Sequence, residues 1–423
     1  MLRNGLIPGL SAGLVAAMVC AVSGPSHAAS RLCALRDGPR GPCTCKSDTD
    51  GPGQFTVVPK SRCRAAASGS AKKDAAPASE AAAETSAGSA APAASGAEAA
   101  NASSEPAPVA TLDAVRQRGK VLCGVNTGLL GFSARTDSGA WAGLDVDFCR
   151  AVAAAVLGDG SKVEFVPLET NERFEALTDG KVDILSRNTT WTMSREVELG
   201  LRFAGVLYFD GQGFMTGDDR GFVSAQQLAG SKVCVEGGTT TEKNMAYFFK
   251  VHQIEVETVV RPTREEMLKA YADGTCDTYS GDHSALYADR ASFAEPAKHA
   301  ILPEVISKEP LGPVVLKGDE AWAEIVRWTL AGLINAEEVG LDKAAAASTG
   351  ALSDDAQRLV DGAGVSGERM GLGKSWLRDV VAAVGNYGEM FEANVGKGSP
   401  LGMERGLNAL WKRGGILTAP PMW

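Results

Sequence analysis

A pattern of strand-like and helix-like segments occurs twice in this 423-residue sequence and limits its fold more than any other feature. The first copy starts with KVLCGVNT at Lys120 and ends with DGKVDILS at Asp179. The second starts with KVCVEGGTT at Lys232 and ends with DGTCDTYS at Asp273. Each copy runs β-α-β-α-β, and both finish on D-G-x-x-D-x-x-S. Since strands that alternate with helices form parallel-rich sheets covered on both faces, the repeat predicts two α/β lobes.

Several helix-like stretches follow Pro310, after the second repeat has ended. Because a sheet needs helices to cover it, we expect this C-terminal tail to pack on the first lobe. The chain must then cross back between the lobes at about residues 301–316. This interpretation assigns residues 111–213 and 310–423 to the first lobe and residues 214–309 to the second.

The sequence before Thr111 has a different composition. Residues 1–28 carry a basic residue, an apolar run and the small-residue sequence SHAAS, which predicts a secretory signal peptide cleaved after Ala28. Cys20 leaves a lipoprotein signal as an alternative, but the residues before it, AMV, lack the small residue expected beside a lipidated cysteine. Residues 65–110 consist mainly of Ala, Ser, Gly, Pro and Glu, which is typical of a disordered linker.

Residues 29–64 hold four cysteines among glycines, prolines and charged residues, with one strand-like run, QFTVVP. A segment this small has little core, so we expect it to depend on cross-links. Two disulfides are the first interpretation. A four-thiolate metal site is the second, and it is weaker because C-x-C differs from the C-x-x-C spacing of ordinary zinc modules. The cysteines are Cys33, Cys43, Cys45 and Cys63.

Four further cysteines divide evenly between the predicted lobes. Cys123 and Cys149 fall in the first lobe, and Cys234 and Cys276 fall in the second. An even number of cysteines in an exported chain favours disulfides over thiol catalysis. Local pairing would give each lobe one bridge, whereas pairing between the lobes would lock them together. We favour the local arrangement.

Charge and motifs argue against several classes of function. The formal net charge of −9 argues against a nucleic-acid-binding groove. No run after the signal peptide approaches the roughly 18 to 20 apolar residues of a membrane helix, so the exported chain is expected to be soluble. Its histidines, His252, His283 and His299, are widely separated. ERMGLGKS resembles a phosphate-binding loop, but Glu368 stands where the first glycine belongs and no strand precedes it.

The first candidate binding segment is SRNTTWTMSRE, directly after the predicted strand VDILS. Arg195 can hold a carboxylate with two parallel hydrogen bonds, and Asn188 and Thr190 can bond an ammonium group or a carboxylate oxygen. The alternative is a surface helix, in which Thr192 is the N-cap and Arg195 lies in solvent.

The second and third candidate segments also follow predicted strands. In VEGGTTTEKN, Thr239 and Glu242 form a capping-box pattern, so the amides of Thr240 and Thr241 should point out of a helix N-terminus toward an anion. In TYSGDHSA, Asp282 can meet a protonated amine. The alternative for both segments is helix capping alone. Together, a guanidinium, helix-end amides and an aspartate have the polarity that an α-amino acid requires.

Several longer stretches resemble a known family. GLDVDFCRAVAAAV, DILSRNTTWTMSRE, VCVEGGTTTEKN, DTYSGDHSAL and the C-terminal NYGEMFEANVG and SPLGMERGLNALWKRGGILTAPP are similar to general L-amino-acid-binding periplasmic proteins of ABC transporters. The resemblance covers about residues 111–423. It implies a two-lobed periplasmic-binding-protein fold of type II, an α/β class with the ligand cleft between the lobes. Residues 29–110 have no counterpart that we recognise.

The resemblance also implies roles for particular residues. Arg195 and the backbone at Thr240 would hold the α-carboxylate, with Thr239 beside them at the helix start, and Asp282 would hold the α-amino group. Asn188 and Thr190 would lie along the first-lobe wall. The remaining two predictions concern aromatic residues: Phe132 would cover the ligand, and Trp191 is expected to serve in packing.

The predicted function is therefore a periplasmic solute-binding protein that delivers L-amino acids to the permease subunits of an ABC transporter. We expect a monomer that needs no cofactor or metal and binds no nucleic acid. The alternative is a secreted two-lobed enzyme that acts on a small carboxylic or amino acid, as a dehydratase does, through carboxylates alone. A receptor sensor domain would need a second membrane segment or a cytoplasmic module, and neither is encoded.

Overall fold

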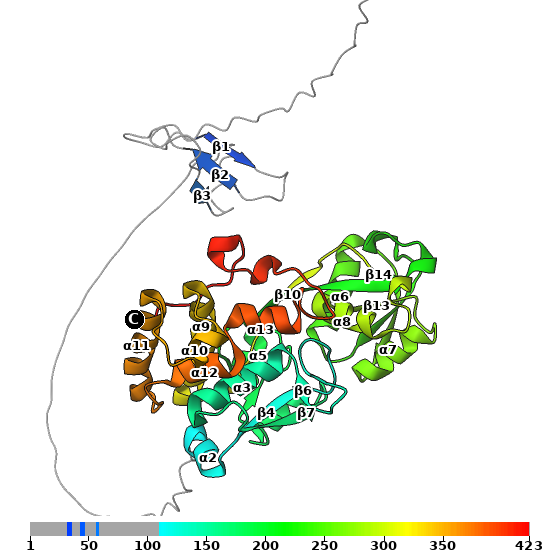
Figure 1. Cartoon of the computed structure of the whole chain (residues 1–423). Coiled ribbons are helices and arrows are strands. Elements are labelled where there is room, and N and C mark those ends of the chain that lie inside the picture. Colours follow the sequence, from blue (N-terminus) through cyan, green and yellow to red (C-terminus); the bar gives the residue numbers. More distant parts are fainter. Residues whose placement is uncertain (1–31, 36–42, 47–55, 59–109, 423) are drawn as a thin grey trace, which may run out of the picture. The chain divides into compact units, whose positions relative to one another are not determined.

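The computed structural model describes the backbone of three short strands, residues 32–35, 43–46 and 56–58, and the chain from 110 to 422 (Figure 1). The chain forms two units, Met1–Asn101 and Ala102–Trp423. In the first unit, β1 (Leu32–Leu35), β2 (Cys43–Lys46) and β3 (Thr56–Val58) form an antiparallel sheet in that order. The predicted signal peptide, the predicted linker before residue 110 and the pairing of the first four cysteines lie outside the described residues.

The first sheet of the second unit has five strands in the spatial order β7-β4-β8-β16-β9. The first three are parallel, and β16 is antiparallel to both of its neighbours. The strands are β4 (Val121–Asn126), β7 (Val163–Leu168), β8 (Ile184–Leu185), β9 (Leu201–Phe203) and β16 (Val314–Leu316).

Helices from both ends of this lobe cover its sheet, with the C-terminal helices gathered beside α3 (Figure 1). The largest hydrophobic core joins α3 to α9, α11, α12 and α13. The helices are α2 (Thr111–Arg118), α3 (Leu144–Leu157), α4 (Arg173–Thr178), α5 (Met193–Val197), α9 (Glu320–Val339), α10 (Lys343–Ala347), α11 (Asp354–Arg369), α12 (Trp376–Val384) and α13 (Tyr387–Asn394). A small hairpin of β5 (Ala134–Arg135) and β6 (Trp141–Ala142) lies before α3.

The second sheet has the order β12-β11-β13-β10-β14, with β15 also paired to β10. Its strands are β10 (Tyr208–Gly217), β11 (Lys232–Glu236), β12 (Glu257–Arg261), β13 (Thr278–Asp282), β14 (His299–Ile301) and β15 (Ser307–Leu311). Its helices are α6 (Thr240–His252), α7 (Arg264–Ala272) and α8 (His283–Ser292). Short 3-10 turns are η1 (Asp218–Arg220), η2 (Ala225–Gln227), η3 (Pro296–Lys298), η4 (Gly406–Asn408) and η5 (Trp411–Arg413).

The repeated D-G-x-x-D-x-x-S motif has the same physical role in both lobes. Gly180 and Gly274 take left-handed φ values of 69° and 73° directly after α4 and α7, which lets the chain leave each helix. The second aspartates, Asp183 and Asp277, each accept a hydrogen bond from a backbone N–H at the start of the lobe's first strand, at 2.7 and 2.8 Å. The motif therefore joins the last strand of each repeat to its first.

Two antiparallel strands connect the lobes. The register pairs Tyr208 of β10 with Leu311 of β15 and ends where Gln212 meets Ser307. These strands span the expected boundaries at residues 213 and 310. Beside them, a Cβ at Gly312 would lie 1.9 Å from the carbonyl oxygen of Gly205, so only glycine permits this close approach.

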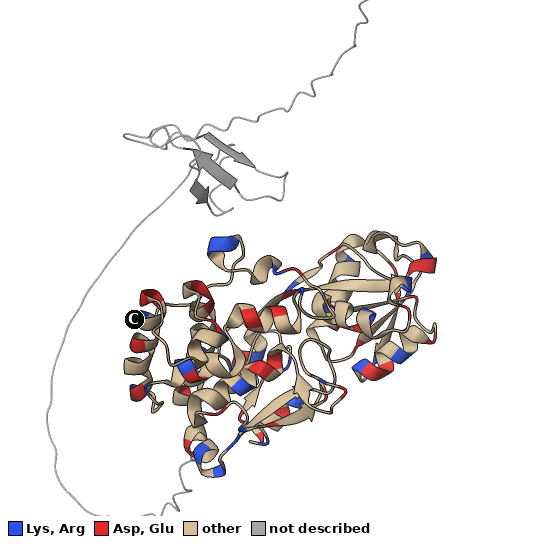
Figure 2. Ribbon diagram, viewed as in Figure 1, with Lys and Arg blue, Asp and Glu red and all other residues tan. Residues whose placement is uncertain are grey.

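Charged residues of both signs are interspersed over both lobes (Figure 2). Among the described residues, the structure contains no helix with the length and apolar character that a membrane crossing requires.

The cysteines of the two lobes pair locally, as predicted. Cys123–Cys149 joins β4 to α3, and Cys234–Cys276 joins β11 to the segment before β13. The Cα atoms are 6.2 and 5.7 Å apart, within the usual range for a disulfide. No disulfide joins the described parts of the two lobes to each other.

Removing either bridge should lower the free energy of unfolding by roughly 3–4 kcal/mol, because each closes a loop in the unfolded chain. The double variant Cys234→Ala, Cys276→Ala should lose slightly more than Cys123→Ala, Cys149→Ala, since the sequence separations are 42 and 26. Urea unfolding under oxidising conditions measures the loss. Under reducing conditions the wild type and the variants should converge, and a difference that persists would contradict the loop-closure account.

Candidate functional site

A cavity of about 70 Å³ lies between the lobes, at the ends of strands from both sheets. It contains six of the seven predicted ligand-binding residues: Asn188, Thr190, Arg195, Thr239, Thr240 and Asp282. The other lining residues from the first lobe are Asn126, Leu129, Thr170, Arg173 and Arg187. Those from the second are Glu236, Thr241, Arg264, Met267, Tyr279, Ser280, Gly281, Ala285 and Asp289.

The loop after β8 forms the first-lobe wall, and hydrogen bonds to the Asp145 carboxyl of α3 hold it in place. This buried carboxyl accepts hydrogen bonds from the Ser186 hydroxyl at 2.9 Å and from the Asn188 N–H at 3.0 Å. Asn188 holds a left-handed φ of 29°, and its side-chain oxygen accepts a hydrogen bond from Asn126 Nδ2 at 3.1 Å. The loop is therefore held in one conformation before any ligand is considered.

Arg195 lies in the cavity wall and not in solvent. Thr192 does cap α5, accepting a hydrogen bond from the Arg195 N–H at 3.3 Å, as the capped-helix alternative predicts. The Arg195 side chain nevertheless turns inward, with 7% of the residue exposed, and its Nη1 donates to the Thr190 carbonyl at 2.6 Å. The cap and the position in the cavity are compatible, because the cap uses only the backbone of Arg195.

The start of α6 forms the opposite wall. Thr239 caps this helix by accepting a hydrogen bond from the Glu242 N–H at 3.1 Å. Glu242 does not complete the predicted capping box, because its carboxylate accepts from the Gly238 N–H at 2.8 Å, one residue before the cap. The Thr240 hydroxyl lies 3.3 Å from the Thr190 hydroxyl and 3.4 Å from a carboxylate oxygen of Glu309. Thr190 and Thr240 thus connect the lobes.

Asp282 directly precedes α8, yet its side chain makes no capping hydrogen bond. Asp210 of β10 performs this capping role instead. Its carboxyl accepts hydrogen bonds from the Ser284 hydroxyl and, at 3.3 Å, from the Ser284 N–H. The capping alternative for the Asp282 side chain is therefore wrong, and its carboxyl lines the cavity.

A second connection between the lobes comes from Arg264 of α7. Its Nη1 donates to the Gly128 carbonyl of the first lobe at 2.9 Å, and its Nη2 pairs with Asp289. The Tyr279 hydroxyl also donates to Asp289, at 2.9 Å. The cavity is therefore enclosed by contacts that exist only while the lobes lie together.

Phe132, the seventh predicted residue, is not among the residues that line the cavity. The backbone reverses between Leu129 and Ser133, which exchange hydrogen bonds of 2.7 and 2.8 Å. This turn places the Phe132 ring in the core, edge-to-face with Tyr208 at a centroid distance of 5.3 Å, and leaves 1% of the residue exposed. Packing explains this side chain fully.

Several lining residues were not predicted from the sequence. Asn126 and Glu236 are the last residues of β4 and β11, so the rule that ligands lie beyond strand ends could have identified them. Arg173 starts the short helix α4, and Arg187 directly follows Ser186 of the repeated motif. Nothing in their sequence context separates these arginines from ordinary surface residues.

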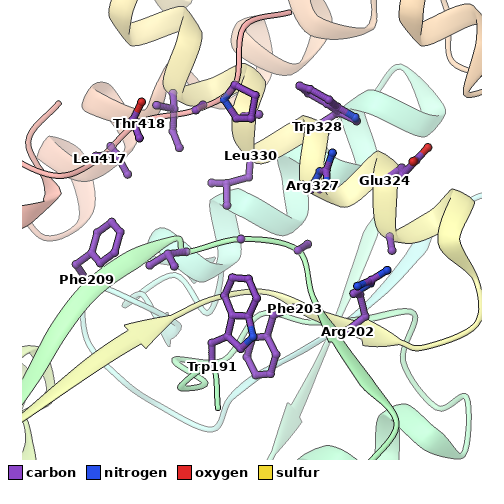
Figure 3. Close-up of a pocket in the computed structure, with 18 of the residues that line it drawn as sticks. Trp191, Arg202, Phe203, Phe209, Glu324, Arg327, Trp328, Leu330, Leu417 and Thr418 are labelled. Carbon is purple, nitrogen blue, oxygen red and sulfur yellow. The ribbon is translucent and has the colours of Figure 1, made fainter. Parts of the chain in front are cut away.

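A larger pocket of about 540 Å³ lies in the first lobe, between α9, the C-terminal segment and the chain before β10 (Figure 3). Trp191 stacks on Phe203 in its wall, with ring centroids 5.6 Å apart, and Leu330 and Leu417 also line it. Trp191 has the packing contact expected for it, although 37% of the residue is exposed. The smaller cavity is the better candidate site, because it brings buried charges of both signs to one place.

Comparisons with known proteins agree with this geometry. Residues 121–340 match the model of the bacterial extracellular solute-binding proteins, family 3. Over 319 residues the chain is 49% identical to the general L-amino acid-binding periplasmic protein AapJ of Rhizobium johnstonii, covering 75% of this chain and 94% of that protein. This chain belongs to the family 3 solute-binding proteins. Another relative of this solute-binding protein is the glutamate/glutamine/aspartate/asparagine-binding protein BztA of Rhodobacter capsulatus, 48% identical over 74% of this chain and 94% of that protein.

A solved structure shows the same fold. The ABC transporter periplasmic binding protein of Brucella ovis, with glutathione bound, is 48% identical and superimposes with a TM-score of 0.71. The match covers 74% of this chain and all of that chain. The predicted two-lobed α/β fold of type II is therefore confirmed. Because the family consists of extracellular binding proteins of transporters, the role of this chain is binding and not catalysis.

The carboxyl groups of Asp210, Asp282 and Glu309 lie close together where the crossing strands of this solute-binding protein approach the cavity. Burial, reinforced by the nearby Asp210 and Glu309 carboxyls, raises the pKa of Asp282 well above its ordinary value, while Arg173 and Arg195 oppose the rise. Burial raises the pKa of Asp210 to about 7, and the Glu309 carboxyl contributes to the rise. The pKa of Asp145 is raised to about 6, again by burial. Negative charge here is costly unless a cation joins it.

Replacing Asp210 with asparagine should make stability less dependent on pH. Between the ordinary pKa of 3.8 and the folded value of about 7, the folded chain holds a proton that the unfolded chain lacks. Wild-type stability therefore falls as the pH rises through this interval, and asparagine cannot lose a proton. From about pH 5 to about pH 8, Asp210→Asn should gain at least about 1 kcal/mol relative to the wild type.

Urea unfolding of ligand-stripped protein at several pH values measures this effect. The exposed Asp137→Asn is the matched control and should keep a constant difference from the wild type. Parallel stability curves for Asp210→Asn and the wild type would show that Asp210 ionises equally in both states.

Proposed function

We propose that this protein captures L-α-amino acids in the cavity between its lobes and delivers them to the permease of an ABC transporter. The observation that carries the proposal is the placement of Arg195 and Asp282 in the walls of one small cavity, on opposite lobes. A zwitterion is the simplest molecule that satisfies both charges. The names of the relatives in Rhizobium johnstonii and Rhodobacter capsulatus, both amino-acid-binding proteins, support this class of ligand.

Each end of the zwitterion has a matching group. Arg195 uses Nη1 on the Thr190 carbonyl, which leaves Nη2 and Nε for the α-carboxylate. The N–H of Thr240, in the first turn of α6, has no acceptor within the helix and adds a second donor. Asp282 accepts from the α-ammonium, which removes the cost of burying its charge. Asn188 lies along the first-lobe wall.

Binding is coupled to closure of the lobes. Arg195 and Asn188 belong to the first lobe, whereas Thr240 and Asp282 belong to the second, so a ligand that contacts all of them favours the closed arrangement. The hydroxyl contact between Thr190 and Thr240 exists only in that arrangement. A permease that recognises the closed form would then distinguish loaded from empty protein.

The remaining parts of the proposal concern location and assembly. Residues 1–28 act as the signal peptide that exports the chain to the periplasm, as their composition predicts. The protein works as a monomer that meets the permease subunits of its transporter. Native mass spectrometry of the mature protein tests the monomer, and N-terminal sequencing after export tests the cleavage site.

A thermal-shift screen of refolded, ligand-stripped protein tests the binding function. It should include the L-amino acids, their D-enantiomers, the matching keto and hydroxy acids, and glutathione. At 100 times the Kd, a ligand adds about 2.7 kcal/mol of stability, which gives a clear shift. We expect shifts with L-amino acids and none with keto acids, which lack the ammonium group that Asp282 needs. A response to keto acids alone would reject the zwitterion site.

Arg195→Ala should lower the affinity for every L-amino acid by about 100-fold or more, because the α-carboxylate would be buried without its main cation. Isothermal titration calorimetry measures the loss. Arg202→Ala is the matched control, since Arg202 lies on the surface, paired with Glu320, and should bind as the wild type does. Near-normal affinity in Arg195→Ala would show that the carboxylate is held elsewhere.

A further inference from the structure

Arg173 is a buried cation that has no hydrogen-bond or ion-pair partner among the described residues. It begins α4 at the cavity wall, and 5% of the residue is exposed. Within the described part of the chain its guanidinium makes no hydrogen bond or ion pair, and its Nε is fully buried. Its Cζ lies over the Phe174 ring, 4.7 Å from the ring centroid. Arg195 lies over the same ring at 5.1 Å, so the contact brings two cations together.

The other arginines in the cavity wall have partners. Arg187, with 3% exposed, donates from Nε to the Leu168 carbonyl at 2.9 Å and from Nη2 to the Thr170 hydroxyl at 2.8 Å. Arg264 pairs with Asp289. Arg195 holds the Thr190 carbonyl and serves the α-carboxylate in the proposed function. Arg173 therefore differs from the other three in having no assigned acceptor.

Burying a guanidinium group without a hydrogen-bond acceptor destabilises the folded protein. An unpaired charge taken from water into a protein interior costs several kcal/mol, and proteins normally pair it or remove it. Burial, followed by the Arg187 and Arg195 charges, lowers the pKa of Arg173, which shows that its surroundings disfavour the cation. An acceptor supplied by a ligand would offset this cost, because no described group accepts a hydrogen bond from Arg173 Nε.

An acceptor without a partner faces the same cavity from the second lobe. Glu236 is the last residue of β11, and its Oε1 is buried with no hydrogen-bond partner among the described residues. Arg173 and Glu236 lie close enough for the Glu236 charge to raise the pKa of Arg173 against the larger opposing effects. A donor and an acceptor, one from each lobe, therefore remain after the α-groups of a ligand have been assigned.

We propose that Arg173 and Glu236 form the subsite for the ligand's side chain, and that it selects L-amino acids whose side chain ends in a carboxylate or a carboxamide. The inference rests on the proposed function, because it needs the α-groups to be held by Arg195 and Asp282. Arg173 donates to the side-chain oxygen of either class. Glu236 accepts from the amide nitrogen of the carboxamides, and the neighbouring Arg187 adds positive charge that favours a carboxylate.

Calorimetric titrations with L-glutamate, L-glutamine and L-norvaline test the subsite, because norvaline has an aliphatic side chain without terminal oxygens. Arg173→Met keeps the length of the side chain and removes its donors. This substitution should lower the affinity for glutamate about 30-fold or more and the affinity for glutamine about 10-fold or more. The affinity for norvaline should stay within about threefold of the wild-type value. Glu236→Gln should lower the affinity for glutamine and leave the affinity for glutamate unchanged or higher.

Arg187→Met is the matched control, because Arg187 is equally buried but bonded to the protein. It should lower the Tm of ligand-free protein, whereas Arg173→Met should leave this Tm unchanged or raise it, since an unpaired buried charge is removed. Equal weakening of all three ligands by Arg173→Met, or a Tm loss like that of Arg187→Met, would overturn the subsite and leave amino-acid binding intact. Wild-type protein that binds none of the three would overturn the proposed function, and the subsite with it.

Discussion

The pairing of β10 with β15 is the constraint on which the rest of the site depends. These two strands join the lobes, and residues along them hold both walls of the cavity. The Pro310 carbonyl accepts a hydrogen bond from the Trp191 N–H at 2.8 Å, which ties the first-lobe loop to β15. Glu309 contacts Thr240 and accepts from Asn244 Nδ2 at 2.7 Å, which ties α6 to the same strand. A shift in this pairing would displace the loop and the helix together.

The same strands determine which aspartate is available to a ligand. Asp210 of β10 caps α8, and this leaves Asp282, the residue in the usual capping position, with a free carboxyl. The arrangement places carboxyl groups close together in a dry region, which raises the pKa of both aspartates. The closed lobes therefore place carboxyl groups that resist ionisation on one side of the cavity, and on the other Arg173, whose guanidinium has no hydrogen bond or ion pair within the described part of the chain. In the proposed function, an amino acid whose ammonium group meets Asp282 and whose side-chain acceptor meets Arg173 relieves both, so closure without a ligand should be disfavoured.

The sequence predicted the fold well because its main determinants are local. The repeated strand and helix pattern, the D-G helix ends and the cysteines in each half all act within one lobe, so each is visible in a short stretch of sequence. Asn188, three residues after β8, and Asp282, the last residue of β13, line the cavity, as the rule that ligands lie beyond strand ends predicts. Phe132 lies outside the cavity wall, because a tight turn and not its position after a strand decides where its ring points.

The residues that were missed depend on both lobes at once. Arg173 stands in NERFEAL, where an arginine at the start of a helix reads as a surface residue. It lines the cavity that the second lobe completes, and no local pattern in the sequence indicates this position. Asp210 and Glu309 are similar, because their importance comes from a strand pairing between segments almost a hundred residues apart. Contacts of this kind become visible only once the register of the crossing strands is known.

The two lobes share the same repeated order of strands and helices but carry different charges where their strands end. This difference makes one wall of the cavity cationic and the other acidic. After the repeated motif, the first lobe continues through Arg187 to Arg195, while the second reaches Asp282 within two residues of Ser280. Arg264 is the cation of the second-lobe wall, and its pairing with Asp289 neutralises it. The first-lobe wall is thus cationic and the second-lobe wall acidic. In the proposed function, a zwitterion enters such a cavity with its carboxylate toward Arg195 and its ammonium group toward Asp282.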